Sequence, residues 1–141
     1  MKETQILLVE DDSTLRETMY EFLSVDHPVI AVSSLAGARS ALRRFNSEDV
    51  ILLDLGLPDG EGLSLLPTIR DLAERPAVII LTGNDDMVAA RLAISEGADD
   101  YIVKSGHLIQ ELAIRIPMVL QRKRQNEFSL ASSGTCSHRG F

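Results

Sequence analysis

Val50-Ile-Leu-Leu-Asp-Leu-Gly-Leu-Pro-Asp-Gly-Glu-Gly62 is the stretch of sequence that decides the fold of this chain. Its first four residues are apolar, with no polar residue between them. Strands that are covered on both faces have this composition, because neither face meets water. One carboxylate, Asp54, ends the apolar run, and a turn rich in glycine and proline follows it. The stretch therefore predicts a buried strand that ends in an acidic turn.

Four more short apolar runs lie on either side of this one, and stretches with helical spacing separate them. The runs cover residues 6–9, 29–32, 77–81 and 101–103. The helical stretches cover residues 14–25, 34–46, 61–73, 85–96 and 107–125. Parallel strands need a connection long enough to hold a helix. The alternation predicts an α/β fold, a doubly wound five-stranded parallel sheet with helices on both faces.

The last predicted helix, residues 107–125, carries an apolar stripe that contains Pro117. Proline removes one backbone hydrogen bond inside a helix, so we expect the helix to be kinked or divided there. Beyond about residue 126 the sequence is small, polar and without a period. We therefore expect one domain over residues 1–126. Residues 127–141 are expected to form a flexible tail, a cut linker or a remnant of cloning.

The charge of the chain limits its partners. Twenty-one acidic and 14 basic residues give a formal charge of -7. Residues 1–104 hold 19 acids and 9 bases, whereas residues 105–141 hold 2 acids and 5 bases. An acidic surface repels phosphate backbones, so the body is not expected to bind nucleic acid. The basic C-terminal segment is the place where a different partner could dock.

Cysteine and hydropathy exclude other classes of protein. A single cysteine, Cys136, allows neither an internal disulfide nor a thiolate zinc site. No apolar run approaches the roughly 20 residues that span a bilayer. The short polar start, residues 1–5, does not have the composition of a signal peptide. We expect a cytoplasmic protein that does not contact membranes.

Polar residues that suit phosphate chemistry follow four of the predicted strands: Glu10-Asp11-Asp12, Asp54, Thr82-Gly83 and Lys104. Ligands of open parallel sheets bind beyond the carboxyl ends of the strands. Each group alone also has a structural explanation, as a helix N-terminus, a turn or a sheet edge. Together, however, neighbouring carboxylates repel one another unless a cation lies between them. Glu10, Asp11 and Asp54 would suit Mg²⁺, and Lys104 and Thr82 would suit a phosphoryl group.

These motifs together resemble the receiver domain of two-component response regulators, which histidine kinases phosphorylate on aspartate. The resemblance covers about residues 4–125. It implies a flavodoxin-like sheet with strand order 2-1-3-4-5. The residues that carry it are Ile6-Leu-Leu-Val-Glu-Asp-Asp-Ser-Thr-Leu-Arg16, Val50 to Gly62 as quoted above, Val78-Ile-Ile-Leu-Thr-Gly83 and Gly97-Ala-Asp-Asp-Tyr-Ile-Val-Lys104.

The resemblance also implies a role for each residue of the acidic site. Asp54 would be the phosphoacceptor, attacking a phosphohistidine or a small phosphodonor in line. Glu10 and Asp11, with Asp54 and the Gly56 carbonyl, would hold Mg²⁺ or Mn²⁺. The metal and Lys104 would stabilise the charge on the phosphoryl oxygens. The chain would then be no enzyme, except that it catalyses its own aspartyl phosphorylation and dephosphorylation.

A conformational switch and its partners follow from the same resemblance. Thr82 would turn to the phosphoryl group and Tyr101 would turn inward, which changes the surface of the fourth helix, fifth strand and fifth helix. Gly56 and Asn84 occupy the positions that modulate phosphoryl lifetime. The implied partners are a histidine kinase or histidine phosphotransfer protein, a downstream output domain or protein, and a second copy in a phosphorylation-linked homodimer.

Two positions depart from the family pattern. Ser105 follows Lys104 where the family usually has a proline in a cis peptide. A non-proline cis peptide costs about 2.5–4 kcal/mol, so either the surroundings impose it or the loop takes a trans path. Glu10 replaces the commoner aspartate, which lengthens the side chain and favours a water-mediated metal contact.

Two alternative functions stay open. One is a pseudo-receiver, an interaction module that is never phosphorylated; the complete set of site residues argues against it. The other is a phosphohydrolase of the haloacid dehalogenase type with an aspartate nucleophile. That class needs a second aspartate two residues after the nucleophile, where this chain has Gly56.

Overall fold

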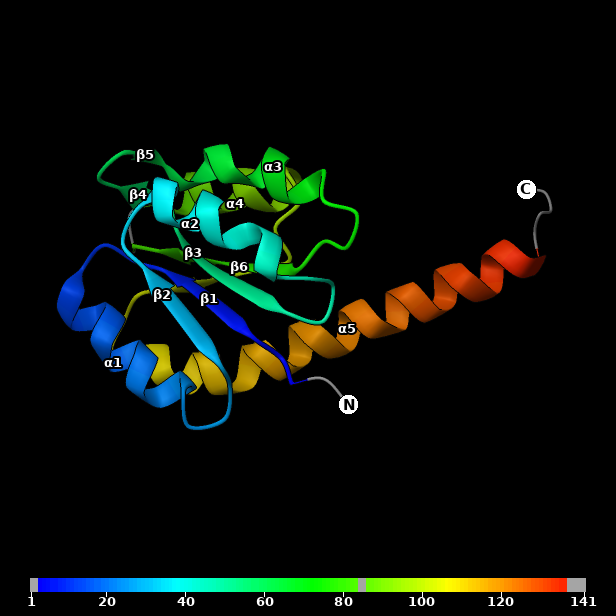
Figure 1. The fold of residues 1–141 in the computed structure, drawn as a ribbon, viewed down its shortest axis with the longest axis horizontal. Helices are drawn as coiled ribbons and strands as arrows, with labels where there is room; N and C mark the ends of the chain where they lie inside the picture. The colour runs from blue at the N-terminus through cyan, green and yellow to red at the C-terminus, as the bar shows by residue number, and fades with distance from the viewer. Residues whose placement is uncertain (1–2, 84–85, 137–141) are drawn as a thin grey trace.

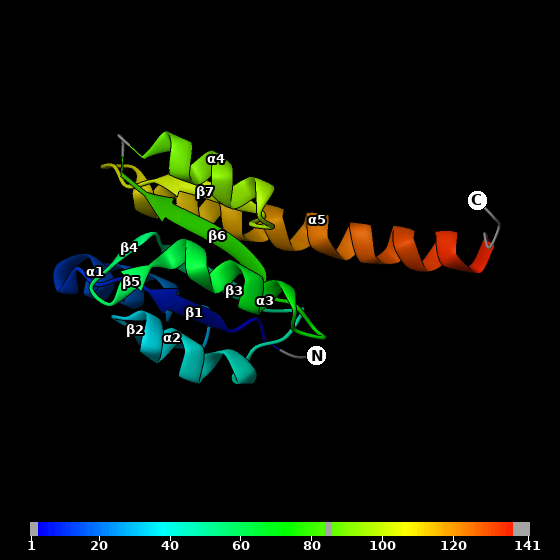
Figure 2. The same ribbon diagram turned by 90° about the horizontal axis from the view of Figure 1, so that it is seen from above.

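Five parallel strands form the central sheet in the order β2-β1-β3-β6-β7 (Figures 1 and 2). The computed structural model describes residues 3–83 and 86–136. The five strands of the sheet are β1 (Ile6–Val9), β2 (Val29–Val32), β3 (Val50–Asp54), β6 (Ala77–Thr82) and β7 (Asp100–Val103). In chain order these are strands one to five, so the predicted order 2-1-3-4-5 is confirmed.

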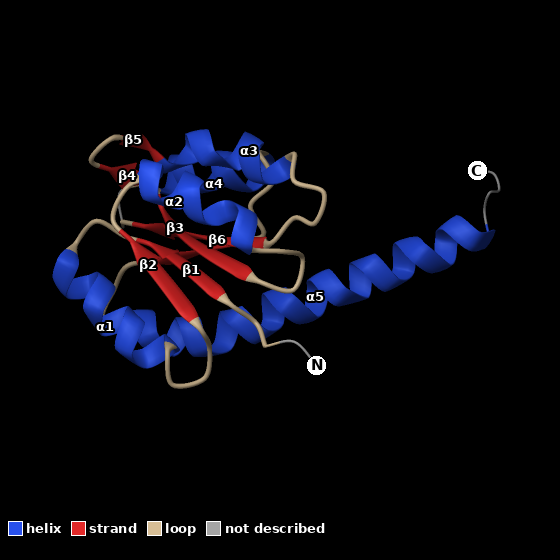
Figure 3. Cartoon of the chain, viewed as in Figure 1, coloured by secondary structure: helices blue, strands red, loops and turns tan. Residues whose placement is uncertain are grey.

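Helices cover both faces of the sheet, as predicted (Figure 3). On one face lie α1 (Ser13–Leu23) and α5 (Leu108–Cys136). The other face is covered by α2 (Leu35–Ala41) with the 3₁₀ turn η1 (Leu42–Arg44), by η2 (Gly62–Leu65) leading into α3 (Leu66–Arg70), and by α4 (Met87–Ser95).

Alternate residues of each central strand supply two separate cores. In β3, for example, Ile51 and Leu53 belong to the core under α2, α3 and α4, while Val50 and Leu52 belong to the core under α1 and α5. Every residue of β3 is buried. This double coverage explains why the strand sequences show no alternation of polar and apolar residues, since both sides of each strand face a helix layer.

The segment after β3 differs from the helix predicted for residues 61–73. Two short strands, β4 (Gly56–Leu57) and β5 (Gly60–Glu61), pair antiparallel and form a hairpin directly after Asp54. The regular helix α3 begins only at Leu66 and has Pro67 in its first turn. Glycine at positions 60 and 62 disfavours helix, whereas proline is tolerated at a helix start, so the helix begins late.

The last helix is longer than predicted. Instead of ending near residue 125, α5 continues as backbone helix to Cys136 and extends beyond the sheet (Figure 1). It is also not divided at Pro117, which lies inside it. Each further residue of a helix adds one backbone hydrogen bond, so a helix can continue where its apolar stripe ends. Residues 137–141 of the predicted tail lie outside the described part of the chain.

The first half of α5 is held to the sheet by an ion pair as well as by its apolar stripe. Arg115 Nη1 lies 3.0 Å from both carboxylate oxygens of Asp100 in β7. Hydrogen bonds to Asp100 are the main reason that the pKa of Arg115 is raised above its ordinary value.

Among the described residues, no helix is both long and apolar enough to cross a lipid bilayer.

The buried strand residue Leu52 tests how much the double coverage contributes to stability. Leu52 is fully buried in β3, and its replacement by alanine leaves a cavity that the packed helices cannot fill. We expect Leu52→Ala to lower the free energy of unfolding in urea by about 2–5 kcal/mol. The control Val88→Ala removes an aliphatic side chain that is 83% exposed, and should change it by less than about 0.5 kcal/mol. Equal losses in both variants would contradict the assigned core.

Candidate functional site

The carboxyl ends of four neighbouring strands bring the predicted site residues to one edge of the sheet. Val9 of β1 pairs in register with Leu53 of β3, so the residues that follow them, Glu10 and Asp54, lie side by side. On the other side of β3, Asp54 pairs with Leu81 of β6. The backbone N–H of Lys104 donates to the Thr82 carbonyl at 2.7 Å, which joins the ends of β6 and β7.

The Lys104 ammonium group bridges the two buried carboxylates. Its Nζ lies 2.9 Å from Glu10 Oε1 and 3.1 Å from Asp54 Oδ2. No cis peptide bond occurs in the described part of the chain, so the bond between Lys104 and Ser105 is trans. Of the two alternatives for this loop, the structure has the trans path, and that path still directs the amine at the site.

Burial sets the electrostatics of this group of residues. Glu10 is completely buried and Asp54 is 6% exposed. Burial and the charge of Glu10 raise the pKa of Asp54 to about 7, against the lowering effect of Lys104. Burial alone would lower the pKa of Lys104, but the two carboxylates outweigh it and hold that pKa above its ordinary value. Lys104 therefore stays charged, while the Asp54 carboxylate needs more positive charge than Lys104 supplies.

The acidic residues fit a hard divalent cation. Glu10, Asp11 and Asp54 each offer a carboxylate oxygen, and these oxygens lie within 4.8 Å of one another. Glu10 Oε1 is buried and accepts no hydrogen bond of good geometry within the described residues; the ammonium of Lys104 is its ion-pair partner. Three carboxylates against one ammonium leave the site negative. Oxygen ligands with this charge are the set that Mg²⁺ prefers.

Asp12 and Arg16, neither of which was assigned a role in the site from the sequence, hold the acidic loop in place. The Asp12 side chain caps α1 by accepting from Leu15 N, and the Asp12 backbone N–H donates to Glu10 Oε2 at 3.1 Å. Asp12 is therefore the N-cap of α1. The Arg16 guanidinium donates to the carbonyl oxygens of Glu10 and Asp11. Aspartate before a helix is a recognisable cap, whereas no sequence signal marks the contact of Arg16.

The side chains of the two predicted switch residues make no hydrogen bond to Glu10, Asp11, Asp54 or Lys104 in the described structure. Thr82 is buried, and its hydroxyl is 3.3 Å from both the Gly83 and the Asp86 carbonyl oxygens. Tyr101 is partly buried and packs against the core under α2, α3 and α4. Asn84, predicted to modulate phosphoryl lifetime, lies outside the described residues.

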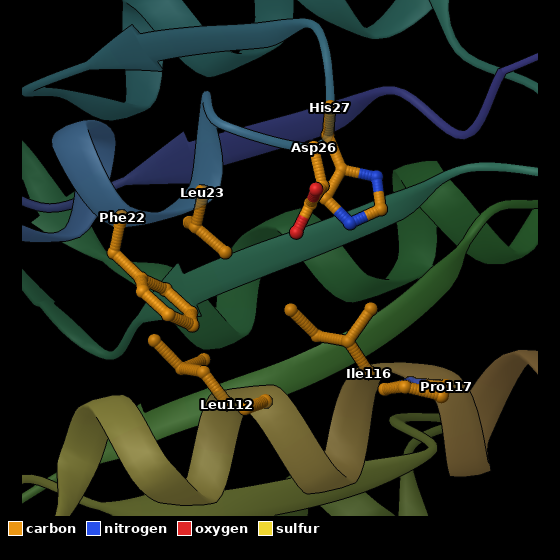
Figure 4. Close-up of a pocket in the computed structure, with 8 residues that line it drawn as sticks. Phe22, Leu23, Asp26, His27, Leu112, Ile116 and Pro117 are labelled. Carbon is orange, nitrogen blue, oxygen red and sulfur yellow. The ribbon is translucent and has the colours of Figure 1, made fainter.

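A small cavity between α1 and α5 lies away from the acidic residues. Its volume is about 150 Å³, and it is lined by Phe22, Leu23, Asp26, His27, Leu112, Ala113, Ile116 and Pro117 (Figure 4). Asp26 and His27 belong to the loop that enters β2 at its N-terminal end. The cavity is therefore at the opposite edge of the sheet and does not contribute to the acidic site.

Comparison with known proteins identifies the class. A family model described as the response regulator receiver domain matches residues 6–115. The chain therefore belongs to the receiver domains of response regulators in two-component signalling. Among solved structures, a response regulator receiver domain protein from Clostridium thermocellum is similar, with a TM-score of 0.77 and 35% identity, over 86% of this chain and 98% of that one.

Curated relatives are longer regulators. The chain is 31% identical over 130 residues to the cell cycle transcriptional regulator CtrA of Caulobacter vibrioides, covering 92% of this chain and 56% of the relative. It is 31% identical over 117 residues to the transcriptional regulatory protein KdpE of Staphylococcus aureus, covering 83% of this chain and 50% of the relative. The chain thus spans about half the length of these relatives.

The raised pKa of Asp54 predicts how stability changes with pH when metal is removed with EDTA. Between its ordinary value of 3.8 and about 7, the folded chain holds a proton that the unfolded chain has released. The free energy of unfolding of the wild type should therefore fall as the pH rises through this window, and level off above it. Asp54→Asn cannot lose a proton there. We expect it to be more stable than the wild type at pH 8, by on the order of 1–3 kcal/mol.

Urea unfolding at pH 5 and pH 8 measures the difference between wild type and Asp54→Asn. The advantage of the variant should be smaller at pH 5, where the wild-type carboxyl group is still largely protonated in the folded chain. An advantage that is equal at both pH values, or a variant that is less stable at pH 8, would contradict the assigned electrostatics.

Proposed function

We propose that this receiver domain is the phosphoacceptor switch of a two-component phosphorelay, phosphorylated on Asp54 in the presence of Mg²⁺ or Mn²⁺. The observation that carries the proposal is the position of Lys104 Nζ, 3.1 Å from Asp54 and 2.9 Å from Glu10, beside a cluster of three carboxylates. A nucleophilic carboxylate, a fixed ammonium group and a cation-binding acid pair are the groups that phosphoryl transfer to aspartate needs.

In the proposed reaction, an oxygen of the ionised Asp54 carboxylate attacks the phosphorus of the donor in line. A bond forms between the carboxylate oxygen and phosphorus, and the bond from phosphorus to the histidine nitrogen or other leaving group breaks, with its electron pair leaving on that group. The product is an acyl phosphate. The Lys104 ammonium group, already directed at Asp54, then donates a hydrogen bond to a phosphoryl oxygen.

Glu10, Asp11 and Asp54, with the Gly56 carbonyl, would hold the metal. A cation held by these residues would supply positive charge to the transferring phosphoryl oxygens. It would also lower the cost of ionising Asp54, because an adjacent positive charge lowers the pKa of a carboxyl group. The nucleophile is then ready in its charged form at neutral pH.

Phosphorylation would be transmitted through Thr82 and Tyr101. The Thr82 hydroxyl is weakly engaged, at 3.3 Å from two carbonyl oxygens, so a phosphoryl group on Asp54 offers it a stronger, charged acceptor. Movement of Thr82 makes room for Tyr101 and biases the surface formed by α4, β7 and α5. The proposed partners are a histidine kinase or phosphotransfer protein, an output domain or protein that contacts this surface, and a second copy of the phosphorylated chain.

Neither alternative fits as well. A phosphohydrolase with an aspartate nucleophile would need an acid at the position of Gly56, and glycine supplies no proton to a leaving group. A pseudo-receiver would have no use for a partly buried lysine directed at two buried carboxylates, since burying charged groups costs free energy that even their pairing repays only in part. We therefore propose a signalling domain, with no activity beyond its own phosphorylation and dephosphorylation.

Phosphorylation by acetyl phosphate tests the proposal directly. Wild-type chain incubated with Mg²⁺ and excess acetyl phosphate should gain one phosphoryl group by intact mass. Asp54→Asn should gain none, because an amide oxygen cannot form a stable acyl phosphate. Asp71→Asn changes an exposed aspartate on another loop and should behave as wild type. No adduct on the wild type with saturating donor, or an undiminished adduct on Asp54→Asn, would overturn the proposal.

The lifetime of the phosphoryl group gives a second test. The modulating positions carry Gly56 and Asn84, neither of which has a carboxylate that could activate an attacking water. We expect a lifetime that is not especially short. Decay of the adduct, followed by intact mass after the acetyl phosphate is removed, measures it. A half-life of seconds in the isolated chain would contradict this expectation.

A further inference from the structure

The hairpin formed by β4 and β5 lies directly after the phosphoacceptor and includes Gly56. Its two strands have only two residues each, with Pro58 and Asp59 between them. A hairpin this short is not stable on its own. Contacts outside the hairpin must therefore hold it, and with it the backbone that borders Asp54.

Asp59 makes the polar contact between the hairpin and α2. Its Oδ1 accepts from Leu35 N at 2.8 Å, and its Oδ2 accepts from Ala36 N at 3.1 Å. These N–H groups are in the first turn of α2, where no helical carbonyl is available to them. The same two bonds hold the pKa of Asp59 below its ordinary value. Hydrogen bonds to an ionised carboxylate are shorter and stronger than neutral ones.

Close packing fixes the hairpin on both sides of this contact. A Cβ at Gly60, where φ is +147°, would lie 2.8 Å from Leu35 Cδ1 of α2. On the opposite side, the Gly62 N–H donates to Leu55 O at 2.7 Å, and a Cβ at Gly62 would clash with the Asp54 carbonyl oxygen. The hairpin is therefore packed closely against α2 at Gly60 and against the end of β3 at Gly62.

We propose that Asp59 is a positioning residue for the metal and phosphoryl site, acting through the hairpin. The hairpin begins at Gly56, whose N–H donates to Asp54 Oδ1 at 3.2 Å and whose carbonyl belongs to the proposed metal ligands. By tying the hairpin to α2, Asp59 holds this N–H and carbonyl in place for the cation and for Asp54. The inference rests on the proposed function of the site, and it assigns a role to a residue outside the ligand set.

The test compares Asp59→Ala with a matched control at the same helix end. Ser34 also caps α2, because its Oγ accepts from Gly37 N at 3.1 Å, but it has no hydrogen bond to the hairpin in the described structure. Ser34→Ala and Asp59→Ala each remove capping from α2, and only Asp59→Ala releases the hairpin. Asp59→Asn keeps one acceptor oxygen, so it can keep one of the two hydrogen bonds to α2. If the loss of these bonds lowers the affinity for Mg²⁺, Asp59→Asn should lower it less than Asp59→Ala does.

Magnesium affinity is the main readout. It is measured on the full chain from the rise in unfolding temperature with MgCl₂ concentration, and from the acetyl phosphate reaction rate at increasing MgCl₂. We expect Asp59→Ala to raise the apparent Kd for Mg²⁺ roughly tenfold, as loss of an outer-sphere partner does, with little change of the rate at saturating Mg²⁺. Asp59→Asn should be intermediate. Ser34→Ala should lower the unfolding temperature without Mg²⁺ but keep the wild-type Kd.

Two outcomes separate failure of this inference from failure of the proposed function. A wild-type chain that binds Mg²⁺ and is phosphorylated, together with Asp59→Ala showing the same Kd as Ser34→Ala, would overturn the role of Asp59 alone. A wild-type chain that neither binds Mg²⁺ nor accepts a phosphoryl group would overturn the proposed function and the positioning role with it. An NMR shift of the Gly56 amide in Asp59→Ala, absent in Ser34→Ala, would support the mechanical link.

Discussion

The ion pairs of Lys104 with the buried carboxylates of Glu10 and Asp54 are the interaction on which the site depends. Two neighbouring carboxylates in a buried position repel each other, and burial disfavours their charged forms as well. One ammonium group relieves this only in part, so the pKa of Asp54 remains raised, to about 7. The unrelieved negative charge is what makes the site suitable for a cation. The same arrangement therefore costs stability in the free chain and, under the proposed function, would favour binding of a metal ion.

The fold makes this arrangement possible by covering the sheet completely. Because helices pack on both faces, the ends of the strands are the places where polar groups can reach both solvent and one another. Glu10, Asp54, Thr82 and Lys104 each come from a different strand end, and the strand order sets which of them are neighbours. The long helix α5 uses the same sheet differently, since its first half packs on the core while its second half extends away from it. A partner domain or protein that contacts α5 would be in physical continuity with β7 and Tyr101.

Much of this could be predicted from the sequence, because it depends on local patterns. Continuous apolar runs such as residues 50–53 predicted buried parallel strands, and polar residues directly after them predicted the site edge. The elements whose predicted bounds differ from the structure are those with weak local sequence signals. The segment after β3 was predicted as one helix, although Gly60 and Gly62 favour a hairpin that depends on contacts with α2. The end of α5 was placed near residue 125 because the apolar stripe ends there, but backbone hydrogen bonds continue the helix to Cys136.

The sequence by itself determined the class of fold, the strand order through its resemblance to receiver domains, and the identity of the residues at the strand ends. These follow from periodicity and from motifs that a single segment contains. Only the tertiary structure decided that Lys104 contacts Glu10 and Asp54 together through a trans peptide, that Arg16 supports the acidic loop, and that Asp59 joins the hairpin to α2. The reason is that each of these contacts depends on how far a side chain reaches between backbone segments whose separation is set by packing, and no local pattern encodes that separation.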